Sequence, residues 1–259
     1  MPTKKSLGQH WLKDPEILKQ IADEADISPG ESVLEIGPGL GTLTSRLLKK
    51  TNNVVVVELD EDLAKKLPGQ FPGKNLKVYN EDILDFDLTI LPKNYKVVAN
   101  VPYYITSKII QKLMTSKNPP KTIVLLIQKE VAERIVAKND QTSLLSLSVQ
   151  IYAEASLGVE VPAHYFTPPP KVDSQVVVLA RRNRPLIDPA EQKDFFKLVR
   201  IGFSAKRKKL STNLSVGYGV NKKDAEKWLA DCNIAQDVRA QQLTIDQWKE
   251  LLHVLRVRN

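Results

Sequence analysis

The chain has one cysteine, Cys232, and three histidines that lie far apart in the sequence, His10, His164 and His253. One cysteine cannot form an internal disulfide, and none of these residues has the spacing of a zinc site. We therefore expect neither a disulfide nor a bound metal ion.

Long apolar stretches are also missing. No run approaches the roughly 18 apolar residues of a membrane span. Residues 1–8 contain two lysines but no apolar segment of signal-peptide length. The composition, 42% hydrophobic and 26% charged, is that of an ordinary globular protein. We expect a cytoplasmic protein that does not associate with membranes.

The excess of positive charge is confined to one end of the chain. Residues 181–259 contain 17 Lys and Arg against 9 Asp and Glu, a net charge of +8, whereas residues 1–180 contain 21 of each. Phosphate backbones attract such a surface through counterion release, which predicts a nucleic-acid partner for the C-terminal part. A solvated, charged helical surface is the alternative explanation.

Strand and helix patterns alternate through the first 180 residues. Apolar runs predict strands at 32–36, 54–57, 76–79, 96–99, 122–127 and 175–180, and amphipathic periodicity predicts helices at 42–50, 61–67, 106–114 and 129–138. This alternation indicates an α/β fold with a Rossmann-like parallel sheet and helices on both faces. The Pro68-Gly69 pair should end the second of these helices.

Two proline-containing stretches interrupt this pattern. Residues 162–170 contain four prolines and no glycine, which fits a stiff connector or a binding loop. Residues 181–185 contain three arginines and end with a proline. Helical patterns follow, including a capping-box pattern at Thr244 and Gln247. We predict two domains, a sheet domain at residues 1–183 and a small, all-helical, basic domain at residues 184–259.

A glycine-rich turn, E-I-G-P-G-L-G at residues 35–41, closes the first predicted strand and opens a helix. Ligands of open α/β sheets bind where strands end, and glycines let the backbone approach them closely. Glu58 ends the second strand 21 residues after Gly37, where a carboxylate can bind ribose hydroxyls. The pattern predicts a cofactor that contains a nucleoside.

The charge around this turn discriminates between two such cofactors. The turn reads G-x-G-x-G and not the dinucleotide pattern G-x-G-x-x-G, and the Glu35 carboxylate would repel a pyrophosphate. S-adenosylmethionine carries a sulfonium, an ammonium and a ribose but no phosphate, so we expect it in preference to NAD. Asp82, just after the third strand, is a candidate acceptor for the adenine amine of the cofactor, or else a turn or helix-capping aspartate.

The sequence N-V-P-Y at residues 100–103 follows the fourth predicted strand. The Asn100 amide oxygen and the Pro102 carbonyl can accept both N–H bonds of an exocyclic amine, and Tyr103 offers a ring for stacking. An ordinary strand-terminal turn explains the same tetrapeptide. Its position, 63 residues after Gly37, favours a substrate base beside the cofactor.

Several segments occur in a defined order along nearly the whole chain. They are K-S-L-G-Q-H-W-L at 5–12, the glycine turn, V-V-V-V-E-L-D at 54–60, N-V-P-Y, F-T-P-P-P-K-V-D-S at 166–174, F-S-A-K-R-K-K-L at 203–210 and R-A-Q-Q-L at 239–243. Together they resemble the ribosomal RNA adenine dimethyltransferases, most closely the bacterial enzymes that act on the small subunit. Trp11 stands where this family usually has Phe, and Gln241 where Glu is usual.

The resemblance implies a Rossmann-like methyltransferase domain with a small helical C-terminal domain. It also implies transfer of methyl groups from S-adenosylmethionine to N6 of two adjacent adenosines in a hairpin loop near the 3′ end of small-subunit rRNA. Each adenosine would receive two methyls. The substrate would be this rRNA within a pre-30S particle, and we expect a monomeric enzyme. The cofactor contacts carried over by motif fall on His10, Leu12, Gly37, Glu58, Asp82 and Asn100.

Adenine N6 is a weak nucleophile because its lone pair is delocalised into the ring. We expect Asn100 Oδ1 and the Pro102 carbonyl to accept its two N–H bonds and so to direct the lone pair at the methyl group. Tyr103 would stack on one face of the flipped base. Phe166 is the candidate for the other face, or else a core anchor for the proline-rich loop.

The basic run Lys206, Arg207, Lys208 and Lys209 is expected to contact rRNA phosphates, with Arg181 and Arg182 as further candidates; simple solvation is the alternative. Three other functions remain open: a large-subunit rRNA adenine methyltransferase, a non-catalytic ribosome-assembly factor of the same fold, and an NAD-binding domain. The segments at 203–210 and 239–243 argue against the first, and the intact N-V-P-Y turn with Glu58 argues against the second.

Overall fold

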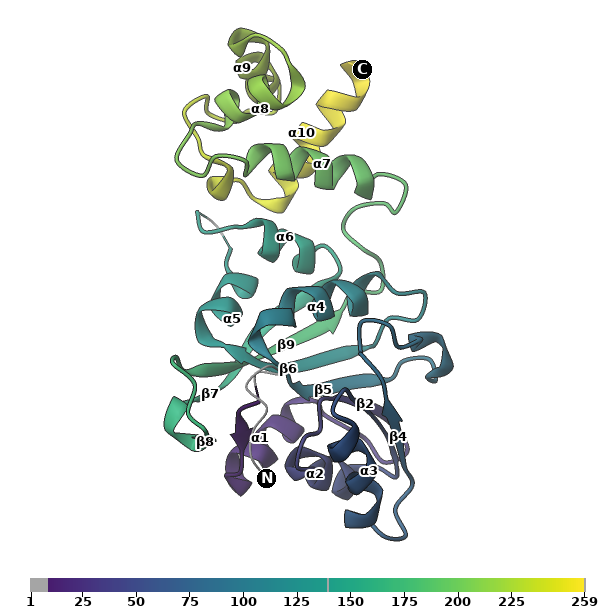
Figure 1. Cartoon of the computed structure of the whole chain (residues 1–259). Coiled ribbons are helices and arrows are strands. Elements are labelled where there is room, and N and C mark those ends of the chain that lie inside the picture. The colour runs from purple at the N-terminus through teal and green to yellow at the C-terminus, as the bar shows by residue number, and fades with distance from the viewer. Residues whose placement is uncertain (1–8, 139, 259) are drawn as a thin grey trace. The chain divides into compact units, whose positions relative to one another are not determined.

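The computed structural model describes residues 9–138 and 140–258, which form two compact units (Figure 1). The first unit contains the chain up to Glu133 together with Glu154–Arg181. The second contains Arg134–Ala153 together with the chain from Arg182 onward.

A seven-stranded sheet forms the centre of the first unit. Its strands lie in the order β4 (Leu76–Asn80), β3 (Asn53–Glu58), β2 (Ser32–Ile36), β5 (Lys96–Asn100), β6 (Thr122–Gln128), β9 (Ser174–Arg181) and β7 (Ala153–Val161). Strands β4 to β6 are parallel, whereas β9 runs antiparallel to β6. The predicted α/β sheet is confirmed, but the expectation of a wholly parallel sheet is wrong at β9. Residues 162–173, which lead into β9, contain no α-helix to serve as the crossover of a parallel strand.

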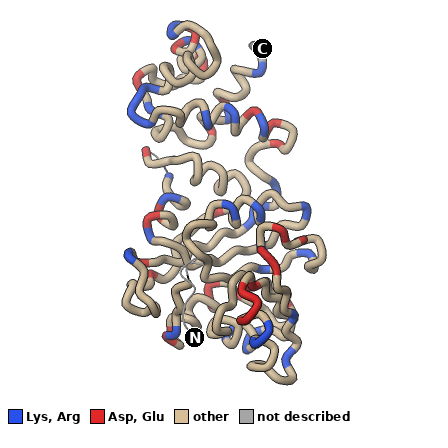
Figure 2. Tube along the Cα trace, in the orientation of Figure 1, with Lys and Arg blue, Asp and Glu red and all other residues tan. Residues whose placement is uncertain are grey.

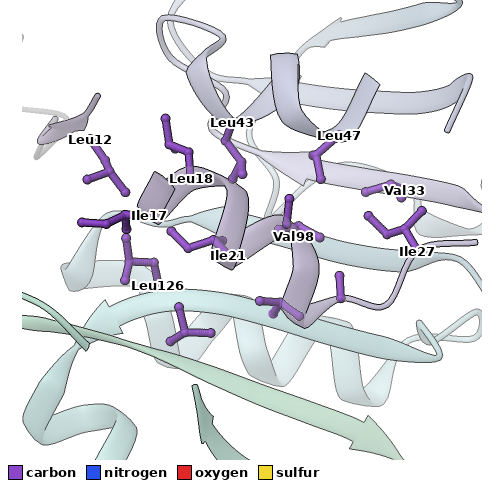
Figure 3. Packing of buried hydrophobic residues seen from close by; sticks show 14 of the residues in the cluster. Leu12, Ile17, Leu18, Ile21, Ile27, Val33, Leu43, Leu47, Val98 and Leu126 are labelled. Carbon is purple, nitrogen blue, oxygen red and sulfur yellow. The ribbon is translucent and has the colours of Figure 1, made fainter. Parts of the chain in front are cut away.

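Helices cover both faces of this sheet (Figure 1). The helices α1 (Pro15–Glu24), α2 (Thr42–Lys50) and α3 (Glu61–Gln70) lie on one face, and α4 (Thr106–Thr115) and α5 (Lys129–Val136) lie on the other. Figure 3 shows leucines and isoleucines of α1 and α2 packed over Val33, Val98 and Leu126 of the strands. Because both faces are covered, the central strands are continuous apolar runs, and this made their positions predictable.

Three local features differ from the sequence expectations. Helix α3 continues through Pro68, so the predicted stop at Pro68-Gly69 is wrong. Pro68 lies in the last turn of α3, where its missing N–H removes a single helical hydrogen bond. Helix α1, capped by the Asp14 side chain, has no counterpart among the predicted helices. The short strand β1 (Trp11–Leu12) pairs with β8 (Phe166–Thr167) and joins the N-terminal segment to the proline-rich stretch.

The second unit is helical, as predicted for the C-terminal part. It contains α6 (Leu144–Gln150), α7 (Gln192–Gly202), α8 (Leu210–Tyr218), α9 (Lys222–Asp231) and α10 (Ile245–Arg258). Their apolar core surrounds Trp248 and Phe195, which are fully buried. Leu147 and Ile151 belong to the same core. Residues 134–153, which the predicted boundary placed in the first domain, therefore pack with the helical unit.

The predicted capping box at the start of α10 is confirmed. Gln247 N–H donates to Thr244 Oγ1 at 3.2 Å, and Thr244 N–H donates to Gln247 Oε1 at 3.0 Å. Within residues 9–138 and 140–258, no helix combines the length and the apolar character that a membrane span requires. The same residues contain no cluster of His, Cys, Asp or Glu side chains suited to a metal ion.

Candidate active site

The glycine turn after β2 has a backbone that only glycine adopts readily. Gly37, Gly39 and Gly41 have φ values of +66°, +56° and +77°, in the left-handed region that disfavours residues with a Cβ. The Gly37 N–H donates to the carbonyl of Val57 at 2.9 Å, which ties the end of β2 to the end of β3. The turn thereby forms one wall of a cavity.

This cavity lies at the carboxyl ends of β2, β3 and β5, where open α/β sheets bind ligands. All six residues predicted to contact the cofactor line it: His10, Leu12, Gly37, Glu58, Asp82 and Asn100. The residues that follow Asn100 in the N-V-P-Y turn line it as well. Residues 5–8 of the N-terminal motif lie outside the described residues.

The charged side chains that line the cavity are all acidic: Glu35, Glu58, Glu81 and Asp82, with no Lys or Arg among the lining residues that the structure describes. Such a lining disfavours a pyrophosphate and suits a ligand that carries positive charge. The sulfonium and ammonium groups of S-adenosylmethionine fit this chemistry, as the sequence predicted.

Glu58 ends β3 and is 6% exposed. Its Oε2 accepts the Gly39 N–H at 3.0 Å, and its Oε1 accepts the Asp60 N–H at 2.8 Å. Burial raises the pKa of Glu58, and these two N–H bonds oppose part of that rise. The Leu59 N–H also interacts with this carboxylate, which leaves at least one of its roughly four acceptor sites for a ribose hydroxyl.

Glu35 lies deeper in the cavity wall and is 1% exposed. Its Oε2 accepts a hydrogen bond from Thr44 Oγ1 at 2.6 Å. Burial is the main reason that the pKa of Glu35 is raised to about 8, and the nearby Glu58 carboxylate adds to this effect. A cationic group of a ligand would favour the ionised form of Glu35.

Asp82 serves as a turn residue and also lines the cavity. Its Oδ1 accepts the Leu84 N–H at 2.8 Å, which is the turn role considered as the alternative to cofactor binding. It also lies in the cavity wall, where a ligand can contact it. The two roles are compatible.

Asn100 is the last residue of β5. Its Nδ2 donates to the backbone carbonyl of His10 at 3.3 Å, and no residue among those described donates to its Oδ1. The Pro102 carbonyl accepts long hydrogen bonds from Ile105 N–H at 3.3 Å and Thr106 Oγ1 at 3.5 Å. The carbonyl therefore begins the turn into α4, and a ligand donor would take the place of the longer of these two bonds, the one from Thr106 Oγ1.

Two contacts fix the ring of Tyr103. Its hydroxyl lies 2.6 Å from Ser174 Oγ at the start of β9, and its ring stacks on His10 with centroids 6.1 Å apart and an interplanar angle of 17°. Burial raises the pKa of the Tyr103 hydroxyl. His10 in turn donates from Nδ1 to the Pro168 carbonyl at 2.7 Å. Ser174 was not among the predicted site residues, although it ends the segment F-T-P-P-P-K-V-D-S.

The structure does not bring Phe166 to the cavity. Its side chain is 3% exposed and packs in the core cluster with Leu12, and it is absent from the residues that line the cavity. Pairing of β1 with β8 holds it there. This placement corresponds to the alternative expectation, a core anchor for the proline-rich stretch, and not to a stacking partner of the base.

The basic run Lys206, Arg207, Lys208 and Lys209 lies in the second unit, in the loop between α7 and α8, where Figure 2 shows a continuous blue stretch. All four side chains are exposed. Asn213 of α8 supports the loop, because its Nδ2 donates to the carbonyls of Gly202 at 2.5 Å and Ala205 at 3.2 Å. The four charged side chains are therefore exposed on a loop that Asn213 stabilises, where phosphate groups can reach them.

Known proteins resemble the whole chain. A family model described as "Ribosomal RNA adenine dimethylase" matches residues 2–256. A "Ribosomal RNA small subunit methyltransferase A" from Dehalococcoides mccartyi is 40% identical over 255 residues, which cover 97% of this chain and 88% of that protein. A protein of the same name from Lactococcus lactis subsp. lactis is 38% identical, with 97% and 90% covered.

Two solved structures share the architecture. A dimethyladenosine transferase from Plasmodium falciparum has a TM-score of 0.83 and 29% identity, covering 96% of this chain and 98% of its own. The 23S rRNA methyltransferase ErmE has a TM-score of 0.78 and 27% identity, covering 95% and 99%.

Proposed function

The chain belongs to the ribosomal RNA adenine dimethylase family, and from this premise we propose that it dimethylates N6 of two adjacent adenosines in the 3′-terminal hairpin loop of small-subunit rRNA. It is an S-adenosylmethionine-dependent methyltransferase. The observation that supports the site most strongly is that the acidic cavity at Glu35 and Glu58 also contains Asn100 and Pro102.

The choice of the small subunit is supported by the relatives. The proteins that are 38–40% identical are named small-subunit methyltransferases, whereas the large-subunit enzyme ErmE is 27% identical. The substrate is then the rRNA of a pre-30S particle, and the enzyme acts as a monomer in the cytoplasm. The large-subunit reaction is the competing function, since ErmE has the same architecture.

When bound, S-adenosylmethionine supplies a methyl group made electrophilic by its sulfonium. Asn100 Oδ1 and the Pro102 carbonyl accept the two N6–H bonds of the flipped adenine and orient the nitrogen lone pair. The hydrogen bond from Asn100 Nδ2 to the His10 carbonyl supports this role, because it restricts rotation of the amide. Tyr103 stacks on the base, held by Ser174 and His10. Catalysis thus depends on orientation and proximity, which can supply up to roughly 7–11 kcal/mol, and it needs no strong base.

The basic run at residues 206–209 binds rRNA phosphates. Its role is sequence-independent positioning, because phosphate contacts fix register while the cavity selects the base.

A competition experiment tests this function. Unmethylated small and large subunits are incubated together with the protein and S-adenosylmethionine labelled in the methyl group. Label confined to small-subunit rRNA supports the proposal, whereas label confined to large-subunit rRNA favours the competing function.

A further inference from the structure

Tyr104 is the most exposed aromatic residue in the part of the chain that the structure describes. It is 62% exposed and it also lines the cavity, so it lies where the cavity opens to solvent. Its side chain makes no hydrogen bond and no ring contact with another described residue. Single exposed aromatic residues are common on protein surfaces, but this one lies at the opening of the candidate active site, where a ligand can contact it.

Tyr103 and Tyr104 differ in their surroundings although they are consecutive residues of the short 3₁₀ helix η3 (Tyr103–Ile105). A 3₁₀ helix has three residues per turn, so neighbouring side chains point about 120° apart. The Tyr103 hydroxyl is held by Ser174, whereas Tyr104 is exposed. One base therefore cannot stack on both rings. If Tyr103 takes the flipped adenine, the ring of Tyr104 is left for a different group.

The proposed substrate contains such a group. Its two adenosines are adjacent, so while one base is in the cavity the other is joined to it through a single phosphate. The charged residues that line the cavity are acidic and repel this phosphate, which keeps the second nucleotide at the opening. Enzymes that flip a base also select their substrate through contacts to the flanking nucleotide, and an exposed aromatic ring can stack on its base.

We propose that Tyr104 stacks on the base of the adenosine next to the one in the cavity, and that it thereby contributes to recognition of an adjacent pair of purines. This inference rests on the proposed function, because it takes the adenosine pair as the substrate. Leu59 is also exposed and lines the cavity, but it follows Glu58, the candidate ribose ligand, and its aliphatic side chain has no ring for stacking.

The test uses small subunits in which one adenosine of the pair is kept and the other is replaced, with each position replaced in turn. The replacement is either a purine riboside, which keeps the bicyclic ring but lacks the amine, or an abasic ribose, which lacks the base. Both substrates offer a single N6 amine at the same position, so a difference between them comes from the neighbouring base. Single-turnover methylation gives the half-saturating concentration of subunits and the maximal rate, and unaltered subunits serve as the reference.

For the wild-type protein, the abasic neighbour should raise the half-saturating concentration roughly 10-fold relative to the purine neighbour, as expected for a stacked base, with little change in the maximal rate. Tyr104→Ala should cause a similar rise with the purine neighbour. Removal of the base should then add little, because ring and base act as a unit. Tyr104→Phe keeps the ring and should behave like the wild type.

Ile90→Ala is the matched control, because Ile90 is 53% exposed and does not line the cavity. It should also behave like the wild type with both substrates. The melting temperature of Tyr104→Ala should stay near that of the wild type, since the side chain is largely exposed. A marked fall in melting temperature, with equal losses on both substrates, would assign Tyr104 a structural role and overturn the inference.

Three further results would overturn it: independent losses from the Tyr104→Ala and abasic changes, no effect of Tyr104→Ala, or no effect of the abasic neighbour on the wild type. Absence of methylation beside the purine riboside would do so as well, because the neighbour would then be recognised through its amine and not through its ring. If the wild-type protein does not methylate unaltered small subunits, the proposed function itself is wrong.

Discussion

The side-chain amide of Asn100 donates from Nδ2 to the backbone carbonyl of His10, 3.3 Å away and 90 residues earlier in the chain. This bond anchors one end of the amide of a residue that lines the cavity. His10 also stacks on Tyr103 and bonds Pro168. One residue of the N-terminal segment, His10, thus contacts the turn proposed to receive the base, the ring proposed to stack on it and the proline-rich stretch.

Asn100→Ala removes the proposed acceptor for N6–H. We expect methylation of unmethylated small subunits to fall by roughly 100-fold, the cost of a misplaced reacting group, while the Kd for S-adenosylhomocysteine rises less than about 10-fold. Single-turnover kinetics and calorimetry measure the two effects. Asn100→Asp serves as the companion variant, because it keeps acceptor oxygens but loses the donor to His10. Turnover of Asn100→Ala close to that of the wild type would refute the orienting role.

We expect Ser174 to position the ring of Tyr103 through the hydrogen bond between their hydroxyls. Ser174→Ala and Tyr103→Phe remove the same hydrogen bond from opposite sides, so each should lower kcat/KM by roughly 2- to 10-fold. The double variant should lose little more than either single one, because the two side chains act as a unit. Tyr103→Ala should lose more, since it also removes the stacking surface. Strictly additive losses in the double-mutant cycle would show that Ser174 does not act through Tyr103.

Glu35 should make stability depend on pH. Its pKa rises from 4.5 to about 8 on folding, mainly through burial, so the folded protein holds a proton that the unfolded chain loses within that window. Stability therefore falls as pH rises from about 4.5 to 8. Glu35→Gln should flatten this part of the curve, measured by chemical denaturation at a series of pH values. The exposed Glu130→Gln on α5 is the surface control. An unchanged slope in Glu35→Gln would contradict the assignment.

Replacing the four residues 206–209 by Ala should weaken RNA binding. It should also make binding less dependent on salt: if all four contact phosphates, the slope of log K against log salt concentration should become less steep by roughly 3. A matched variant removes the same charge from exposed lysines of α9 and α10: Lys222, Lys223, Lys227 and Lys249. Titrations at several salt concentrations compare the two. An equal change in both would assign the effect to net charge and not to the run between α7 and α8.

Prediction from the sequence was most accurate for elements that several neighbouring residues indicate together. Residues 54–57 are all valine, and covered strands require such runs, so β3 was found within one residue at each end. The glycine turn and Glu58 could be predicted both from their residue types and from the spacing between them. Both line the cavity.

The sequence did not predict the features of the fold that depend on contacts between residues far apart in the chain. The antiparallel pairing of β9 with β6, the two-residue pairing of β1 with β8 and the packing of residues 134–153 with the helical unit depend on partners far along the chain. Phe166 illustrates the consequence: its motif suggested a stacking residue, but the pairing of β1 with β8 places it in the core. Helix α1 was detectable, since Asp14, Pro15 and the buried Ile17, Leu18 and Ile21 form a capped amphipathic pattern.

The most direct test of the central claim is mass spectrometry of small-subunit rRNA after incubation of unmethylated subunits with this protein and ¹³C-methyl S-adenosylmethionine. We expect two adjacent adenosines in the 3′-terminal hairpin, each carrying two labelled methyls on N6, and almost no label with Asn100→Ala. Label on another atom or another nucleotide, or equal labelling by Asn100→Ala, would contradict it.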